Sequence, residues 1–186
     1  MKLRLTHLIL AGALALGAGA QRIAILSDIH VTPGNPCDSA LRVAVDEINA
    51  ADFDMVIVNG DLTNEGSDEQ LTNVKRTLDG IRHPLYVLPG NHENNWSQRA
   101  TKTFVDLWGN DRFVTTTDSL VIVGINCGPY MKMGDGHVKQ EDLHWLKSTL
   151  DSLVTDGRRV LSFNHYPLLT DLDNVADYMA LLSQYP

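Results

Sequence analysis

The sequence predicts an α/β fold with a mixed, mainly parallel sheet flanked by helices. In the first half of the chain, short apolar runs of strand length alternate with amphipathic stretches of helix length. Such alternation is typical of parallel strands joined by right-handed helical crossovers. In the second half, two apolar runs flank Asp118-Ser119, which predicts a hairpin and therefore an antiparallel pair within the sheet.

The first half supplies three expected strands and three expected helices. The strands are short apolar runs at residues 22–27, 54–58 and 85–88, and their unbroken apolar character favours burial on both faces. The helices carry apolar residues on one face at helical spacing. Asp38 or Ser39 is expected to cap the first helix, and the other two are expected at residues 67–79 and 97–108, with Gly80 and Gly109 as their terminators.

The second half begins with the hairpin, expected at residues 112–117 and 120–125. A loop with Gly and Pro follows at 127–136. Residues 140–153 carry leucines at helical spacing, 159–163 form another apolar strand, and 173–183 are expected to form a last helix.

The first 20 residues have the pattern of a secretory signal. Lys2 and Arg4 give a basic start, an apolar run covers residues 8–16, and Ala18-Gly19-Ala20 is a small-residue cleavage pattern. We therefore expect cleavage after Ala20 and an exported protein, periplasmic or secreted, with one domain at residues 21–186. The alternative is an uncleaved N-terminal anchor, although the apolar run is too short and glycine-rich to predict a stable membrane span.

Charge and cysteine content narrow the classes of function. The net charge of −8 argues against broad nucleic-acid binding, which needs a basic face. Cys37 and Cys127 could pair in an oxidising compartment, but pairing depends on a geometry that the sequence does not give. The sequence leaves the oligomeric state open.

Four of the expected strands end in side chains that are typical metal ligands. These are Asp28 and His30, then Asp61, then Asn91 and His92, and finally His165. Each feature alone is ordinary turn or surface chemistry, but ligands bind at the carboxyl ends of parallel strands, where these residues would meet. Because alternate side chains of a strand share a face, residues 28 and 30 are expected to point into one crevice.

The mixture of donors indicates the kind of metal. Carboxylate, imidazole and amide oxygen together suit manganese, iron or zinc. A single carboxylate can bridge two cations, and Asp61 is placed to do so. Two such ions would clamp a phosphoryl group and activate a water.

These motifs resemble those of the calcineurin-like metallophosphoesterases. The resemblance rests on Asp28-Ile29-His30, Gly60-Asp61, Gly90-Asn91-His92-Glu93 and the later His165, in that order. It implies a four-layer α-β-β-α sandwich and a di-metal centre of manganese, iron or zinc. It also implies metal-dependent hydrolysis of phosphate esters, without saying which ester.

The resemblance also implies a set of metal ligands. Asp28 and His30 would bind one metal, and Asn91 and His165 would bind the other. Asp61 would bridge the two ions, and a metal-bridging hydroxide would attack phosphorus.

Three further residues are candidates for contact with the substrate. By the resemblance, His92 is the general acid that protonates the leaving oxygen. Glu93 is a candidate for substrate binding, for orienting His92 or for capping the next helix. His137 lies in a glycine-containing loop on the expected ligand rim, which makes it a candidate for substrate contact.

The sequence departs from the family in one large feature and one small one. The family closes its site with Gly-His-x-His, and no His follows His165 here. We therefore expect residues 21–186 to be the N-terminal part of a phosphoesterase domain whose C-terminal end is missing. The alternative is an inactive or non-catalytic phosphoesterase-fold module of a larger surface or periplasmic protein. Asn64 stands where some members have a second Asp, and the acidic charge disfavours a nuclease of the same family.

Overall fold

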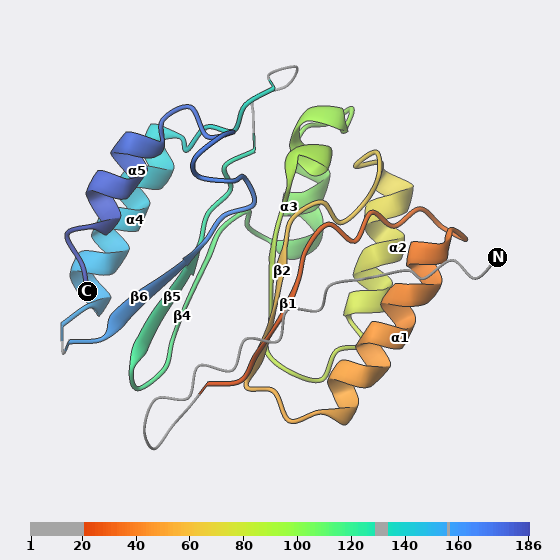
Figure 1. Cartoon of the computed structure of the whole chain (residues 1–186). Helices are drawn as coiled ribbons and strands as arrows, with labels where there is room; N and C mark the ends of the chain where they lie inside the picture. Colours follow the sequence, from red (N-terminus) through yellow and green to blue (C-terminus); the bar gives the residue numbers. More distant parts are fainter. Residues whose placement is uncertain (1–20, 129–133, 156) are drawn as a thin grey trace.

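The structure is a computed structural model, which describes residues 21–128, 134–155 and 157–186. Two three-stranded sheets lie face to face, in the orders β1-β2-β3 and β4-β5-β6, and helices cover their outer faces (Figure 1). This four-layer α-β-β-α arrangement confirms the expected fold class. Residue patterns alone indicate one mixed sheet, but the structure divides the strands between two sheets.

The first sheet is entirely parallel. It contains β1 (Ile23–Leu26), β2 (Met55–Asn59) and β3 (Leu85–Leu88), with β2 in the centre. β2 is buried on both faces, as its apolar run predicts. β1 is not, because it is an edge strand, and only Ala24 of its residues is buried.

The second sheet combines both strand directions. β4 (Phe113–Thr116) pairs antiparallel with β5 (Leu120–Gly124), which confirms the hairpin around Asp118-Ser119. β6 (Arg159–Phe163) pairs parallel with β5 and brings the chain back to the same rim. The mixed character is therefore confined to this sheet.

In the part of the chain that the structure describes, five α-helices cover the two sheets. Their bounds are α1 (Pro36–Ala50), α2 (Asp68–Leu78), α3 (Lys102–Trp108), α4 (Gln140–Leu153) and α5 (Val175–Leu182). The first three pack on the first sheet, and α4 and α5 pack on the second (Figure 1). α1 is capped by Asn35, not by Asp38 or Ser39, because Pro36 suits the first helical position and the Asn35 side chain accepts the Asp38 N–H at 2.8 Å.

Alternation along the central strands divides the core into three apolar layers. Met55 and Ile57 of β2 meet Ile122 of β5 between the sheets. Val58 faces the helices on the first sheet, and Val121 faces those on the second. Since each central strand is covered on both faces, its sequence is apolar without alternation.

The segment after β3 differs from the expected helix at 97–108. The chain first forms a π-helical turn at His92–Trp96, and α3 begins only at Lys102. Ser97 is extended, and Ala100 has a positive φ of 50°, so no helix continues through this region. Gly109 ends α3 in the left-handed conformation, as expected.

Some sequence-based expectations fall on residues without a described placement. Residues 1–20, which carry the predicted export signal, and residues 129–133 of the expected loop lie outside the described residues.

Cys37 and Cys127 are both free thiols. Among the helices of the described residues, none is long and apolar enough to cross a lipid bilayer.

Candidate metal centre

The candidate ligands meet on one rim, at the carboxyl ends of strands from both sheets. Asp28 and His30 follow β1, Asp61 follows β2, Asn91 and His92 follow β3, and His165 follows β6. The first three strands belong to one sheet and β6 to the other. The centre therefore lies where the two halves of the sandwich meet.

Three of these residues adopt the left-handed backbone conformation. The φ angles are 54° for Asp28, 44° for His30 and 50° for Asp61. Such angles are uncommon outside glycine and are concentrated at functional sites. β1 has already ended at Leu26, so the strand alternation expected for residues 28 and 30 does not apply. The two side chains instead fall into different clusters.

Two clusters of possible ligands share one carboxylate. The first is His30, Asp61 and His92, and the second is Asp28, Asp61 and His165; in each, the ligand atoms lie within 4.8 Å of one another. Asp61 is only 4% exposed. Its Oδ2 lies 3.7 Å from His30 Nε2 and 3.8 Å from His92 Nε2, and its Oδ1 lies 3.3 Å from His165 Nε2. This central position fits the bridging role expected for Asp61.

The electrostatics around Asp61 favour its ionised form. Burial opposes the negative charge, but the hydrogen bonds and charges of His165 and His92 outweigh it and lower the Asp61 pKa. The backbone N–H of His92 also donates to Asp61 Oδ1 at 3.0 Å. The carboxylate is therefore held charged at the centre of the site.

His165 is fixed by a backbone carbonyl and by the close approach of a glycine. Its Nδ1 lies 2.8 Å from the Asn59 carbonyl oxygen, which leaves Nε2 directed at Asp61. Burial opposes a charge on the ring, but the hydrogen bond to Asp61 and its charge raise the His165 pKa to about 9. Gly60 has a φ of 84°, and a Cβ there would lie 2.4 Å from His165 Nδ1, so only glycine fits.

The Asn91 amide tests whether a cation fits this donor set. Its side-chain oxygen lies 3.2 Å from His165 Nε2 and 3.3 Å from each of the two carboxylate oxygens of Asp61. Electron-rich atoms at these distances need a proton, a reversed amide or a positive ion among them. With carboxylate, imidazole and amide oxygen present, the residues fit manganese, iron or zinc.

His92 has its two ring nitrogens in different environments. Nδ1 contacts the Asn64 backbone carbonyl oxygen, so this nitrogen carries a proton, and Nε2 faces Asp61. The ring meets His30 edge-on at 4.7 Å and stacks on Trp96 at 5.5 Å between ring centroids. Trp96 is 64% exposed and extends this aromatic surface outward from the site.

Glu93 is a buried link between two loops, so it is not in a position to contact a substrate. It is 0% exposed. Its Oε1 accepts the Thr63 N–H at 3.0 Å and the Thr63 hydroxyl at 2.9 Å, and its Oε2 accepts the Gly90 N–H at 2.9 Å. Burial, followed by the charge of Asp61, raises its pKa despite these hydrogen bonds. Glu93 thus joins the loops after β2 and β3 and, instead of bonding the His92 ring, supports it indirectly.

His137 lies apart from both ligand clusters of the described residues. Its Nδ1 lies 2.8 Å from Asp173 Oδ1, and its backbone N–H donates to the Cys127 carbonyl oxygen at 3.0 Å. His137 therefore lies in the loop that precedes α4, and its side chain contacts the loop that precedes α5.

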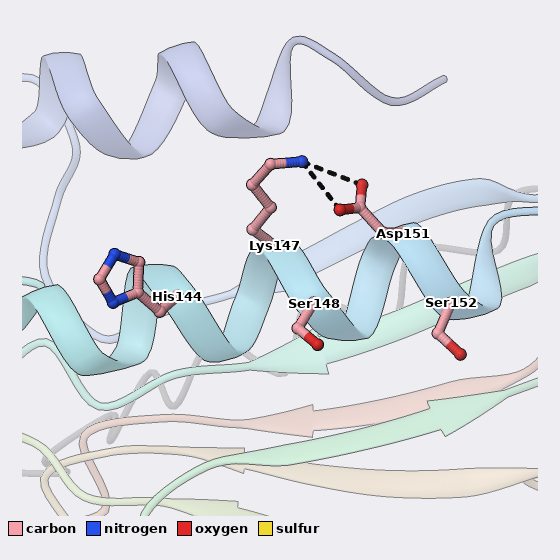
Figure 2. Close-up of a pocket in the computed structure, with 5 residues that line it drawn as sticks. All are labelled: His144, Lys147, Ser148, Asp151 and Ser152. Carbon is pink, nitrogen blue, oxygen red and sulfur yellow. Dashed lines mark hydrogen bonds and ion pairs between the residues drawn. The ribbon is translucent and has the colours of Figure 1, made fainter.

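Two hollows lie outside the ligand clusters. A cleft of about 760 Å³ lies between residues 64–69 and 96–99, with Trp96 in its wall. A shallower hollow of about 510 Å³ runs along α4, and Figure 2 shows its lining side chains with the ion pair between Lys147 and Asp151, at 2.8 Å. All residues lining this second hollow come from one helix, and its ion pair joins neighbouring turns, as is common on an exposed helix face.

The sequence does not predict the backbone groups that orient the imidazoles. The carbonyl groups of Asn59 and Asn64 hold His165 and His92, but every residue has a carbonyl group and no residue type marks this use.

Comparisons with known proteins agree with this geometry. Residues 21–182 match the family model described as calcineurin-like phosphoesterase. Among solved structures, a dimetal phosphatase from Danio rerio is similar to this chain, with a TM-score of 0.68 and 14% identity over 88% of this chain and 77% of that one. A purple acid phosphatase from yellow lupin seeds gives 0.58 and 15%, covering 84% and 32%. These likenesses show the shared fold.

The curated relatives of this chain have low sequence identity to it. A probable glycerophosphodiester phosphodiesterase, GpdQ, of Arcobacter nitrofigilis is 29% identical over 61% of this chain and 42% of its own length. A probable cyclic nucleotide phosphodiesterase of Fibrobacter succinogenes is 22% identical over 88% and 67%. A 3',5'-cyclic-nucleotide phosphodiesterase of Nostoc is 24% identical over 73% and 52%. The chain thus spans from 42% to 67% of the length of these relatives.

The family match covers nearly all the described residues, and the fold and ligand rim agree with it. The chain therefore belongs to the calcineurin-like phosphoesterase family.

Proposed function

We propose that this chain hydrolyses phosphate esters at a di-metal centre on the rim shared by its two sheets. The observation that carries the proposal is the buried Asp61 carboxylate, which belongs to both ligand clusters. The relatives described as phosphodiesterases favour diesters as the substrate class.

Five residues would hold the two ions: Asp28, His30, Asp61, Asn91 and His165. Manganese, iron or zinc fits these donors, and such ions neutralise phosphoryl charge and activate water when bound. Asp61 would be shared by the two ions, because its Oδ1 faces the His165 imidazole and its Oδ2 faces the His30 imidazole.

His92 would donate a proton to the leaving group. As the imidazolium, it donates from Nδ1 to the Asn64 carbonyl and offers a second proton at Nε2. As a water oxygen bonds to phosphorus, the bond from phosphorus to the ester oxygen breaks, and that oxygen takes the Nε2 proton. The attacking water loses its own proton to solvent, and His92 is left in the Nδ1–H form that the Asn64 carbonyl stabilises.

The first 20 residues would direct export to the periplasm or the medium. The basic start, the short apolar run and Ala18-Gly19-Ala20 support this proposal. Sequencing the N-terminus of the secreted or periplasmic protein would test it, with Gln21 as the expected first residue.

The function is tested by metal content and ester turnover together. With manganese supplied, we expect hydrolysis of bis(4-nitrophenyl) phosphate, and losses of roughly 10²-fold or more for Asp61→Asn and His92→Ala. Only Asp61→Asn should also lower the metal content. His83→Ala is the matched control, because His83 lies before β3, at the opposite end of that strand, and contacts the Ile48 carbonyl. A folded protein that binds no manganese, iron or zinc would refute the proposal.

A second candidate is a phosphoesterase-fold module without activity. It is favoured by the ligand count, because each cluster of the described residues offers three ligand atoms, whereas manganese commonly takes six. Weak metal binding and no turnover by a folded chain would support this candidate over the enzyme.

A further inference from the structure

Two buried asparagines join the loops of the two sheets beside the metal centre. Asn94 lies in the π-helical turn after His92, and Asn126 lies just after β5. They are 4% and 1% exposed. Each amide donates to the other, from Asn94 Nδ2 to Asn126 Oδ1 and from Asn126 Nδ2 to Asn94 Oδ1, both at 3.1 Å. The pair is therefore a reciprocal amide bridge between the sheets.

The other two hydrogen bonds of the Asn94 side chain stabilise the turn in which this residue lies. Its Nδ2 donates to the Gly90 carbonyl oxygen at 2.7 Å, and its Oδ1 accepts the Thr101 hydroxyl at 2.6 Å. Gly90 precedes Asn91 and His92, and its N–H is held by Glu93 at 2.9 Å. The turn that presents Asn91 and His92 is thus fixed at Gly90 and again at Asn94.

The other two hydrogen bonds of the Asn126 side chain stabilise the loops of the second sheet. Its Nδ2 donates to Asp111 Oδ2 at 2.9 Å, and its Oδ1 accepts the Gly128 N–H at 2.8 Å. Every donor hydrogen and acceptor oxygen of the two amides is used, so the bridge has one arrangement. A Cβ at Gly128 would lie 2.1 Å from Asn94 Nδ2, which shows how closely the second sheet's loop packs on the first.

The bridge is not needed to hold the sheets together. Met55, Ile57 and Ile122 already pack between them, and Tyr86 donates to the Thr115 hydroxyl across the same interface at 2.9 Å. What distinguishes the asparagine pair is its place, since it ends on the carbonyl of Gly90 next to the candidate ligand Asn91 and the candidate acid His92. π-helical turns are also frequent at functional sites.

We propose that Asn94 and Asn126 are positioning residues, which hold the turn at residues 90–94 against the second sheet so that Asn91 and His92 keep their places on the rim. The side-chain hydrogen bonds of both asparagines go to residues other than the candidate metal ligands, so both act through their neighbours. This inference rests on the proposed function, because it assigns the pair a role at that site.

The test compares Asn94→Leu, Asn126→Leu and the double variant, which keep side-chain size and remove the bridge. We expect kcat for bis(4-nitrophenyl) phosphate to fall roughly 10-fold or more with little change in KM, since small misplacements of reacting groups are costly. Manganese affinity, measured by calorimetric titration, should also fall because Asn91 moves. The double variant should lose no more than the worse single variant, because the residues act as a unit.

Tyr86→Phe is the matched control, because it removes a different hydrogen bond between the same two sheets. It should lower the melting temperature but leave kcat and manganese affinity unchanged. If a Leu variant fails to fold, Asn94→Asp and Asn126→Asp, which keep the size and the acceptors, replace it in the same comparison.

The proposal is overturned if the folded asparagine variants keep wild-type kcat and manganese affinity, or if Tyr86→Phe loses as much of both. If the wild-type protein turns over no ester, the proposed function fails separately. Manganese affinity and the ring nitrogen NMR shifts of His92 then still decide whether the pair positions this turn.

Discussion

At the scale of single residues, backbone carbonyl groups orient two of the site imidazoles, those of His92 and His165. The Asn64 carbonyl holds Nδ1 of His92, and the Asn59 carbonyl holds Nδ1 of His165. Each contact leaves Nε2 directed at Asp61. A side-chain substitution at either asparagine therefore leaves the orienting group in place.

Asn64→Ala tests this assignment. We expect kcat to stay within about twofold of the wild type, because the carbonyl remains, and stability to fall by about 0.5–1 kcal/mol through loss of the 2.8 Å hydrogen bond from Asn64 Nδ2 to Thr32 Oγ1. Ester kinetics and urea unfolding measure the two effects. Asn64→Asp, which keeps the side-chain size and introduces the Asp that some family members have, serves as the control. A tenfold fall in kcat for the Ala variant would show that the side chain itself acts on His92.

Glu93→Gln tests the buried link between the loops after β2 and β3. Gln keeps the size, but its amide has only one oxygen, so its NH2 group faces the N–H of either Thr63 or Gly90 and cannot accept it. We expect a loss of about 1–3 kcal/mol in the free energy of unfolding, because a buried donor is left unsatisfied. Urea unfolding measures it, with the exposed Glu69→Gln as control. A loss no larger than that of the control would contradict the role of Glu93 as a hydrogen-bond acceptor for both loops.

The sequence predicted which side chains gather at the site better than how they are held. Strand ends and residue types brought together Asp28, His30, Asp61, Asn91 and His165, and the structure places all of them on one rim. The left-handed backbone at three of these residues has no pattern in the sequence, since tertiary contacts stabilise it. The same reason explains why Asn94 and Asn126, which are 32 residues apart, were not predicted as a pair.

At the scale of elements, periodicity predicted the strands and most helices, and local side-chain contacts decided the exceptions. The helix expected at 97–108 is shortened to Lys102–Trp108, because the chain before it forms a π-helical turn, which the Asn94 amide supports by donating to the Gly90 carbonyl, and then extends at Ser97. Asn35, and not Asp38, caps α1 for a similar reason, since the Asp38 side chain accepts the Gly34 N–H at 3.1 Å. Asp38 also accepts Asn73 Nδ2 of α2 at 3.0 Å and so joins the two helices.

Asp38→Asn tests that joint through its pH dependence. The hydrogen bond from Asn73, together with those of Gly34 and Arg42, lowers the Asp38 pKa from 3.8 despite burial. A lowered folded-state pKa gives stability that is present above the ordinary pKa and is lost as pH falls through the folded value. We expect the variant to be about 1–2 kcal/mol less stable near neutral pH, and this difference to shrink as the pH falls below the ordinary Asp pKa.

Unfolding by urea at a series of pH values measures this difference. Asp46→Asn, at an exposed position on the same helix, is the control and should differ little from the wild type at any pH. A difference for Asp38→Asn that stays constant from neutral to strongly acidic pH would contradict the charge-based coupling of α1 to α2.

At the scale of the whole molecule, the metal centre lies across the boundary between two sheets. The sequence predicts strands but does not state how they divide, because β6 could extend a single sheet as easily as it joins the hairpin. In the structure, His165 comes from the second sheet, and the other candidate ligands come from loops of the first. A cation held by both sets would therefore tie the two halves together as well as serve chemistry.

This arrangement predicts that metal stabilises the whole fold. Ligand at 100 times its Kd adds about 2.7 kcal/mol, which raises Tm by roughly 5–10 °C for a chain of this size. We expect manganese to raise Tm by this order, a chelator to reverse the rise, and His165→Ala to abolish most of it by removing the second sheet's ligand. His83→Ala, at the far end of β3, should keep the full rise. A rise that survives in His165→Ala would show that the metal binds the first sheet's loops alone, and the centre would then not join the two halves of the molecule.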